Sequence, residues 1–322
     1  MSSTNAVNFA LRPSKSIERE VVFEATRALM SLFEVEPQFY LGFGSVWFAD
    51  FHLAIRYFAL NRLISIEMDE IAFKRAQYNK PYRHVEVHEG ESAVVVPELL
   101  RGGLEDQAGI FWLDFDSEID EDKVNELTNL VQQAGDGSVV LATFNVVPGS
   151  YSPPRERIKA LREIFGDAFI EPEPVANADR SAKVWYNDHD AFAKVVIEST
   201  VRLLASAASA GGKGGGTIPV VSLLYKDSAL MATVGVMVLS AAQRSRVDES
   251  LVRSLTPQQI TKILAPILTH KEVLALRQLL PSNKAMTRSV VQRLGFDLSE
   301  EQIEGFEEHF LRYPLFLQAS IM

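Results

Sequence analysis

The feature that most constrains the fold is a regular alternation, between residues 37 and 145, of short apolar segments with stretches of helical periodicity. The apolar segments have the length of buried strands, and strands joined through helices pair in parallel because a parallel neighbour needs a crossover. Strands that are apolar on both faces need helices on both sides of the sheet. The five predicted strands cover residues 39–43, 63–67, 84–87, 110–114 and 138–144.

Beyond residue 148 the pattern predicts helices and one hairpin. Residues 218–225 and 229–239 are long apolar segments separated by a short polar turn, which predicts two antiparallel strands. The tract at 205–216, rich in glycine, alanine and serine, predicts a surface loop. The alternative, a phosphate-binding loop, is disfavoured because the tract lacks the spacing of a P-loop.

The last part of the sequence, from Thr256 onward, predicts a helical appendage. Capping boxes begin at Thr256 and Ser299, and Gly295 ends the helix between them. Apolar residues at helical spacing predict one further helix, over residues 17–33, before the first strand. We therefore expect three parts, which are an N-terminal helical segment at 1–36, an α/β domain at 37–240 and the appendage at 241–322.

Composition excludes several classes of site and partner. The chain has 322 residues and no cysteine, which excludes disulfides, cysteine-bound zinc, iron–sulfur clusters and thiol catalysis. Residues 1–16 lack the apolar core of a signal peptide, and the longest apolar stretch is about half the ~20 residues of a membrane-spanning helix. We therefore expect a cytoplasmic protein without a membrane segment. Its net charge of -10 disfavours bulk binding to nucleic acid.

A glycine turn follows the first predicted strand and precedes a predicted helix. Its residues Gly42, Phe43, Gly44 and Ser45 stand at the carboxyl end of the strand, where open α/β sheets bind ligands. Glu67 ends the next strand, near the spacing of ~20 residues at which an acidic side chain accepts hydrogen bonds from ribose hydroxyls. Together these features predict a nucleoside site. The alternative is that the glycines only form a tight turn and Glu67 only caps the following helix.

Other candidate residues follow the third and fourth strands. Glu91 is placed to reach an adenine amino group, or else lies on a plain surface turn. Asp114 and Asp116 close a wholly apolar strand, and paired carboxylates at such a place favour proton transfer or cation binding. The alternative is that they cap the next helix. Among the histidines, His52 is placed best to act as a base, and the alternative for it is a packed or solvated side chain.

This arrangement resembles the class I S-adenosylmethionine-dependent methyltransferases over residues 37–150 and 217–240. In that family a glycine loop and three acidic positions at strand ends surround the cofactor, and an antiparallel seventh strand completes the sheet. The resemblance implies an α/β fold with a mostly parallel seven-stranded Rossmann-like sheet and an antiparallel terminal hairpin. Residues 12–19, 42–45 and 48–50 are also similar to bacterial O-methyltransferase-like proteins.

The resemblance assigns roles to individual residues. It implies that Gly42 and Gly44, with Phe43 and Ser45 between and beside them, approach the methionine part of S-adenosylmethionine. It also implies that the ribose is held by Glu67, that the adenine lies near Glu91, and that the methyl group and the acceptor face Asp114 or Asp116. The acceptor would be a small molecule or a protein-borne oxygen. Association with another chain would use the C-terminal helices.

The sequence departs from the family at two positions of the loop. Tyr40 replaces the usual acid before the first glycine, and Val46 replaces a third glycine. The acid normally receives the cofactor's ammonium, so we expect Asp50 or Asp114 to supply the missing charge. A divalent cation is a further candidate, because Asp114, Asp116 and Asn145 incompletely resemble the set that binds one in some O-methyltransferases.

A basic cluster, formed by Arg12, Lys15 and Arg19, begins the first predicted helix. It predicts a solvated helix face, and the alternative is a set of groups that grip an anionic substrate at the mouth of the site. Three functions remain open from the sequence. The leading one is an O-methyltransferase, the second is a non-catalytic nucleotide or cofactor sensor, and the third is a nicotinamide-dependent dehydrogenase.

Overall fold

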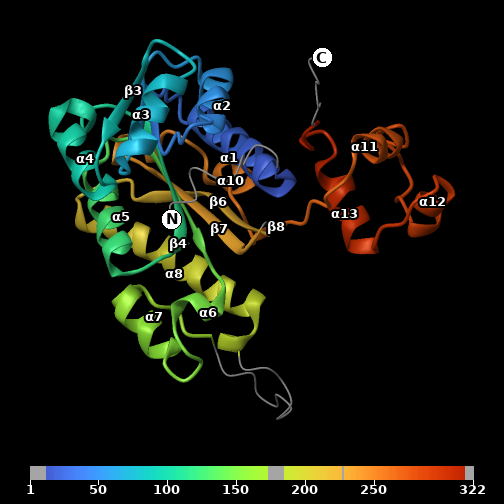
Figure 1. Cartoon of the computed structure of the whole chain (residues 1–322). Helices are drawn as coiled ribbons and strands as arrows, with labels where there is room; N and C mark the ends of the chain where they lie inside the picture. Colours follow the sequence, from blue (N-terminus) through green and yellow to red (C-terminus); the bar gives the residue numbers. More distant parts are fainter. Residues whose placement is uncertain (1–11, 173–184, 227, 316–322) are drawn as a thin grey trace.

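One eight-stranded sheet organises the computed structural model, which describes residues 12–172, 185–226 and 228–315 (Figure 1). The strand order is β3-β2-β1-β4-β5-β7-β6-β8. The first five strands are mutually parallel, whereas β7 is antiparallel to both β5 and β6. The strands are β1 (Phe39–Gly42), β2 (Leu63–Glu67), β3 (Val85–Glu89), β4 (Gly109–Glu118), β5 (Val139–Asn145), β6 (Thr217–Lys226), β7 (Leu230–Val238) and β8 (Thr261–Ile263).

Helices cover both faces of the sheet and divide the core into two layers. Side chains of α4, α5, α7 and α8 pack on one face, and those of α1, α2 and α3 pack on the other. The helices are α1 (Pro13–Leu32), α2 (Ala49–Phe58), α3 (Glu70–Asn79), α4 (Ser92–Leu99), α5 (Glu121–Gln133), α6 (Pro148–Tyr151), α7 (Arg157–Phe165), α8 (His189–Ala210), α9 (Ala241–Ser245), α10 (Glu249–Leu255), α11 (His270–Arg277), α12 (Arg288–Arg293) and α13 (Glu300–His309). The predicted parallel sheet between two helical layers and the antiparallel hairpin are confirmed.

The sheet has eight strands, one more than the sequence predicts. The capping box at Thr256 starts no helix, because Thr256 is the C-cap of α10 and the chain then extends into β8. In β8 the side chain of Ile263 is fully buried and the backbone pairs in parallel with the edge strand β6. Pairing with an open edge and burial of Ile263 therefore outweigh the local capping signal.

The appendage beyond β8 is helical, as expected. Figure 1 shows α11, α12 and α13 gathered to one side of the sheet, at the red end of the colour scale. The capping box at Ser299 is present at the start of α13. The division of the chain at residues 36 and 240 stays a prediction, although β8 belongs to the main sheet.

The predicted surface loop at 205–216 is partly helical. Helix α8 continues to Ala210, and only the residues after it form turns before β6. Ala207 and Ala208 are buried against the core, and alanine is the strongest helix former, so this part of the tract packs rather than loops out. Within the described residues, no helix is long and apolar enough to cross a membrane.

The point at which the strand order reverses lies at β1. This strand pairs with β2 on one side and with β4 on the other, so the crossovers leave toward opposite faces of the sheet. The loops at the carboxyl ends of these strands separate there and leave a crevice, which is where open α/β sheets bind their ligands.

Candidate functional site

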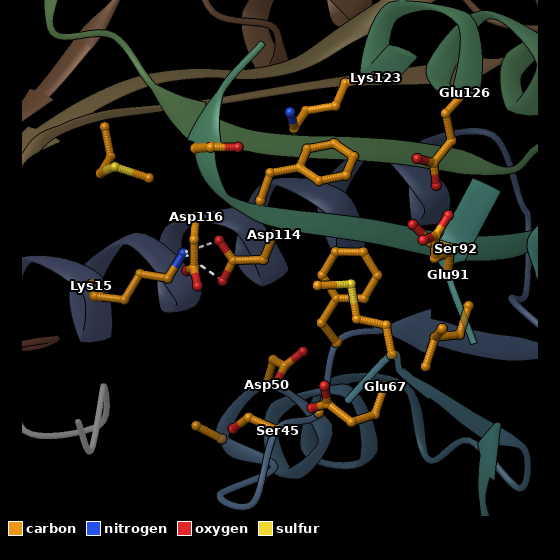
Figure 2. A pocket seen from close by; sticks show the side chains of 18 of the residues that line it. Lys15, Ser45, Asp50, Glu67, Glu91, Ser92, Asp114, Asp116, Lys123 and Glu126 are labelled. Carbon is orange, nitrogen blue, oxygen red and sulfur yellow. Dashed lines mark hydrogen bonds and ion pairs between the residues drawn. The ribbon is translucent and has the colours of Figure 1, made fainter. Parts of the chain in front are cut away.

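A cavity of about 640 Å³ opens at the carboxyl ends of β1 to β4. Its lining comes from the glycine turn after β1, from the ends of β2 and β4, from the start of α4, from α5, and from α1 with the β6–β7 hairpin (Figure 2). The predicted site residues on this lining are Phe43, Gly44, Ser45, Glu67, Glu91, Asp114 and Asp116. Most of the predicted set therefore converges on one cavity.

The glycine turn is held by contacts within the protein. The Gly44 amide donates a hydrogen bond to the Ser65 Oγ at 3.1 Å, and a Cβ at Gly44 would lie 2.6 Å from the Phe48 ring. Glycine is thus required there for packing between β1, β2 and α2. Gly42 does not line the cavity, because it lies within β1, and its added Cβ would meet the Tyr40 hydroxyl at 2.7 Å.

An acid does stand beside the turn, although it comes from α2. The buried Tyr40 hydroxyl donates a hydrogen bond to Asp50 Oδ2, and Asp50 lines the cavity. Burial raises the pKa of Asp50, against the opposing charge of Arg19 and the Tyr40 hydrogen bond. Tyr40 therefore stands where the family has an acid, and the carboxylate of Asp50, from α2, lines the cavity beside the turn instead.

Glu67 lines the cavity at the end of β2 and its whole residue is only 8% exposed. Burial raises the pKa of its carboxyl group, while hydrogen bonds from the Asp69 and Met68 backbone oppose the rise. Glu91, the N-cap residue of α4, also lines the cavity and makes no side-chain cap bond. Both carboxylates thus have oxygens that a ligand in the cavity can reach. Neither a helix cap at Glu67 nor a plain surface turn at Glu91 would require this position.

Asp114 meets a cation that the sequence analysis placed on a solvated face. The Lys15 Nζ lies 2.9 Å from each carboxylate oxygen of Asp114 (Figure 2). It donates a second hydrogen bond to the Tyr225 hydroxyl at 3.1 Å. It also lies 5.4 Å from the ring centroids of Trp112 and Tyr225. Lys15 is 3% exposed. Burial alone would lower its pKa, but the charges of Asp114 and Glu18 raise that pKa above its ordinary value.

A series of buried, hydrogen-bonded polar side chains connects Lys15 to the core. Glu18, one turn along α1, is fully buried with its Oε2 at 3.5 Å from the Lys15 Nζ, and its Oε1 accepts a hydrogen bond of 2.5 Å from Thr233. Thr233 in turn accepts from Thr143 at 2.8 Å, and Thr143 accepts from the Trp112 indole at 3.0 Å. Burial raises the pKa of Glu18 to about 7. This series ties α1 to β4, β5 and β7 beneath the cavity.

The other predicted base lies elsewhere. His52 does not line the cavity, and its Nδ1 is hydrogen-bonded to the Tyr82 hydroxyl at 2.7 Å on the exposed side of α2. Helix α2 begins at Ala49, so that Asp50 in its first turn lines the cavity while His52, two residues later, contacts Tyr82. His52 is thus an exposed side chain outside the cavity lining, as the alternative of a packed or solvated histidine expects.

The residues also do not fit the divalent-cation alternative. Both oxygens of Asp114 contact the Lys15 ammonium, and the Asn145 Oδ1 accepts a hydrogen bond from the Val147 amide at 2.7 Å. Among the described residues, no group of three or more His, Cys, Asp or Glu side chains is arranged to hold a metal ion. We therefore derive no step through a metal.

The sequence contained a signal for the missed residues. Lys15 and Glu18 share the helical face of Val22 and Leu29, both of which are fully buried. Residues 3, 4 or 7 positions apart lie on one helix face, so this spacing places the two charged groups toward the core. A charged side chain on a helix face that is predicted to be buried needs an oppositely charged or polar partner. The spacing of Lys15 and Glu18 therefore indicated partners in a distant part of the sequence.

Comparison with known proteins places the chain in a family. The family model described as "Putative O-methyltransferase" matches residues 7–321. Similar solved structures include the cofactor-bound Rv0187 from MTB, at 16% identity, 67% coverage of this chain, 80% coverage of that chain and a TM-score of 0.37. They also include the O-methyltransferase TomG from Streptomyces achromogenes, at 15% identity, 67% and 80% coverage and a TM-score of 0.36.

A third similar structure is that of Trm1 from Pyrococcus horikoshii with S-adenosyl-L-methionine, at 11% identity, with 73% of this chain and 58% of that chain covered and a TM-score of 0.42. No protein with curated annotation matches the sequence. The family match spans every described residue, including the glycine turn, all eight strands and the helical appendage. The chain belongs to this family of O-methyltransferases.

Proposed function

We propose that the protein binds S-adenosylmethionine in this cavity and methylates an oxygen of a small-molecule or protein-borne acceptor. The single observation that carries the proposal is that the glycine turn, Glu67, Glu91 and Asp114, which are far apart in the sequence, line one cavity at the reversal of the strand order. Membership of the O-methyltransferase family supports the reaction type.

The lining suits a cationic nucleoside ligand. In the proposal Glu67 accepts hydrogen bonds from the ribose hydroxyls, and Glu91 lies toward the adenine amino group. Asp50, held by Tyr40, receives the ammonium of the methionine part and so replaces the acid that the loop lacks. Ser45 and the Gly44 backbone line the cavity next to Asp50 and leave room for that part of the ligand.

The reaction needs an acceptor oxygen placed in line with the donor. When bound, the cofactor supplies a methyl group on a sulfonium, and the protein's own contribution is to position the acceptor and to take up a proton if the acceptor is a hydroxyl. In the proposal Asp114 and Asp116, at the end of β4, are the carboxylates that face the acceptor and accept this proton. Lys15 fixes Asp114 by contact with both of its oxygens.

Calorimetric titration of the purified protein tests the proposal. We expect saturable binding of S-adenosylmethionine and of its demethylated product, S-adenosylhomocysteine, and none of NAD. Folded protein that binds neither sulfur compound would contradict the proposal, and binding of NAD alone would favour a dehydrogenase. Binding without turnover on any hydroxyl or carboxylate acceptor would favour the sensor.

Three expectations about the setting of the protein remain predictions. They are a bacterial origin, a cytoplasmic location and association through the C-terminal helices. Sedimentation of the full chain, compared with a variant shortened before α11, tests the last of them. A monomeric full chain would contradict it.

A further inference from the structure

The cavity is lined by charges of both signs, and the signs are unevenly placed. Eight carboxylate side chains and four cationic side chains line it. Three of the four cations lie at the start of α1: Arg12 is its N-cap residue, and Lys15 and Arg19, four residues apart, lie on one side of the helix. The α1 side of the cavity is therefore the cationic side.

Two of these three cations have partners within the protein. Lys15 contacts Asp114 and Tyr225, and an Arg12 Nη1 donates a hydrogen bond to the Ser228 Oγ at 3.2 Å. These contacts join α1 to the end of β4 and to the β6–β7 hairpin. They account for the positions of Arg12 and Lys15 without any ligand.

Arg19 differs from both. It is 7% exposed, yet across residues 12–172, 185–226 and 228–315 its guanidinium makes no hydrogen bond and no ion pair. Asp50 is affected by the charge of Arg19, but Asp50 accepts its hydrogen bond from Tyr40. A guanidinium stays protonated at all ordinary pH values, so burial cannot be relieved by loss of the proton. A buried charge that lacks a partner is costly.

We propose that Arg19 is an anion-binding residue of the cavity, whose guanidinium pairs with a carboxylate or phosphate group of a ligand that enters it. This proposal rests on the proposed function. Planar oxyanions fit the fork of N–H groups on arginine in a two-point contact, which lysine cannot make. Such an anion has two sources, which are the carboxylate at the amino-acid end of the cofactor and an acidic group on the methyl acceptor.

The first arm of the test separates the cofactor source from the nucleoside site. S-adenosylhomocysteine carries the amino-acid end, and 5′-methylthioadenosine lacks it. If the cofactor supplies the anion, Arg19→Gln weakens binding of S-adenosylhomocysteine by about ten- to a hundredfold and leaves 5′-methylthioadenosine within about twofold. Failure of the wild type to bind either nucleoside would instead contradict the proposed function, so the two failures are distinguishable.

The second arm tests the acceptor source. Benzoate and phenyl phosphate are titrated into the protein saturated with S-adenosylhomocysteine, with neutral benzamide as the comparison. If the acceptor supplies the anion, the wild type binds one of the anions more tightly than benzamide, and Arg19→Gln removes that preference while leaving the affinity for S-adenosylhomocysteine unchanged. Arg19→Lys keeps the charge without the fork, and we expect it to recover only part of the affinity in either arm.

The control is Arg27→Gln, which removes the same charge from an exposed position of the same helix. It should behave as the wild type in both arms. Stability without ligand gives a second readout, because the unfolding midpoint of Arg19→Gln in urea should equal or exceed that of the wild type if Arg19 lacks a structural partner. Unchanged binding in both arms, or a clear fall in the midpoint without ligand, would overturn the proposal.

Discussion

The two sides of the cavity differ in how their charged residues are held. On the strand side, Glu67 and Glu91 stand at the ends of β2 and at the start of α4, and each is positioned by its own element. On the α1 side, Lys15 is positioned by Asp114 and Tyr225, which lie 99 and 210 residues away in the sequence. The strand side is local in origin, whereas the α1 side exists only after α1 has packed on the sheet.

The two sides should also differ in how the loss of a charge affects the stability of the fold. Removing a carboxylate from the strand side should change ligand binding with little effect on folding, because within the described part of the chain the Glu67 carboxylate receives hydrogen bonds only from the neighbouring backbone of Met68 and Asp69. Removing the Lys15 charge from the α1 side should change folding, because its partner Glu18 is fully buried with it and its partner Asp114 is partly buried.

Lys15→Met should destabilise the protein by about 3–5 kcal/mol, the usual effect of removing one partner from a buried ion pair. The substitution leaves Asp114 and the fully buried Glu18 without their cation. The measurement is the free energy of unfolding in urea. Lys123→Met is the matched control at another cation of the cavity lining, where Lys123 pairs with Asp120, whose side chain is 45% exposed. We expect a loss below about 1 kcal/mol there, and equal losses in the two variants would contradict the division.

Glu67→Ala should weaken binding of S-adenosylhomocysteine by about 1–3 kcal/mol, because ribose hydroxyls would lose a charged acceptor. Its free energy of unfolding should change little, since among the residues that the structure describes this buried carboxyl group forms no side-chain pair with another element. Calorimetric titration and urea unfolding measure the two effects on the same protein. An unchanged dissociation constant would contradict the ribose assignment, and a large loss of stability would show that Glu67 is held as Lys15 is.

Glu18 makes the α1 side sensitive to pH. Burial raises the pKa of its carboxyl group from 4.5 to about 7, so the folded state binds this proton more tightly than the unfolded state does. Its contribution to stability is therefore fully present below the ordinary pKa and is lost as the pH rises through about 7. A proton on Glu18 leaves Lys15 with Asp114 alone as its charged partner.

The test compares the wild type with Glu18→Gln, which keeps the shape and removes the titration. Between about pH 5 and about pH 8, the wild type should lose about 1–3 kcal/mol of unfolding free energy relative to the variant. Urea unfolding at a series of pH values measures the difference. A difference that stays constant with pH, or one that grows in favour of the wild type as the pH rises, would contradict the buried-carboxyl interpretation.

The sheet was predictable because its signals are local. Five strands and their order of appearance follow from apolar segments separated by amphipathic ones, and the hairpin follows from two long apolar segments with a short turn. Strand β8 was not predictable, because it has three residues and forms only against the edge of β6. Helix α8 continues to Ala210, inside the tract predicted as a loop, because Ala207 and Ala208 pack against the core.

The site residues can also be divided into those with a local sequence signal and those without one. Ser45, Glu67 and Glu91 were predicted because residues at the carboxyl ends of parallel strands gather at one edge of the sheet. The roles assigned to them remain proposals. Lys15 and Arg19 were assigned to a solvated face because sequence spacing shows which side of a helix a residue occupies, but does not show what that side meets.

Substitution of His52 should have the smallest effect on ligand binding and on stability, because His52 lies just outside the cavity lining. It lies only two residues beyond Asp50 in α2, yet its Nδ1 is bonded to Tyr82 outside the cavity lining. His52→Ala should therefore leave the affinity for S-adenosylhomocysteine within about twofold and reduce stability by about 1 kcal/mol or less, through loss of one exposed hydrogen bond and of its ring contact with Tyr82. Asp50→Asn, made in parallel, should weaken the same ligand clearly, because its charge lies within the cavity. If His52→Ala lowered ligand affinity as much as Asp50→Asn does, the helix after the glycine turn would have to present both side chains to the ligand. The placement of His52 outside the cavity lining would then be wrong.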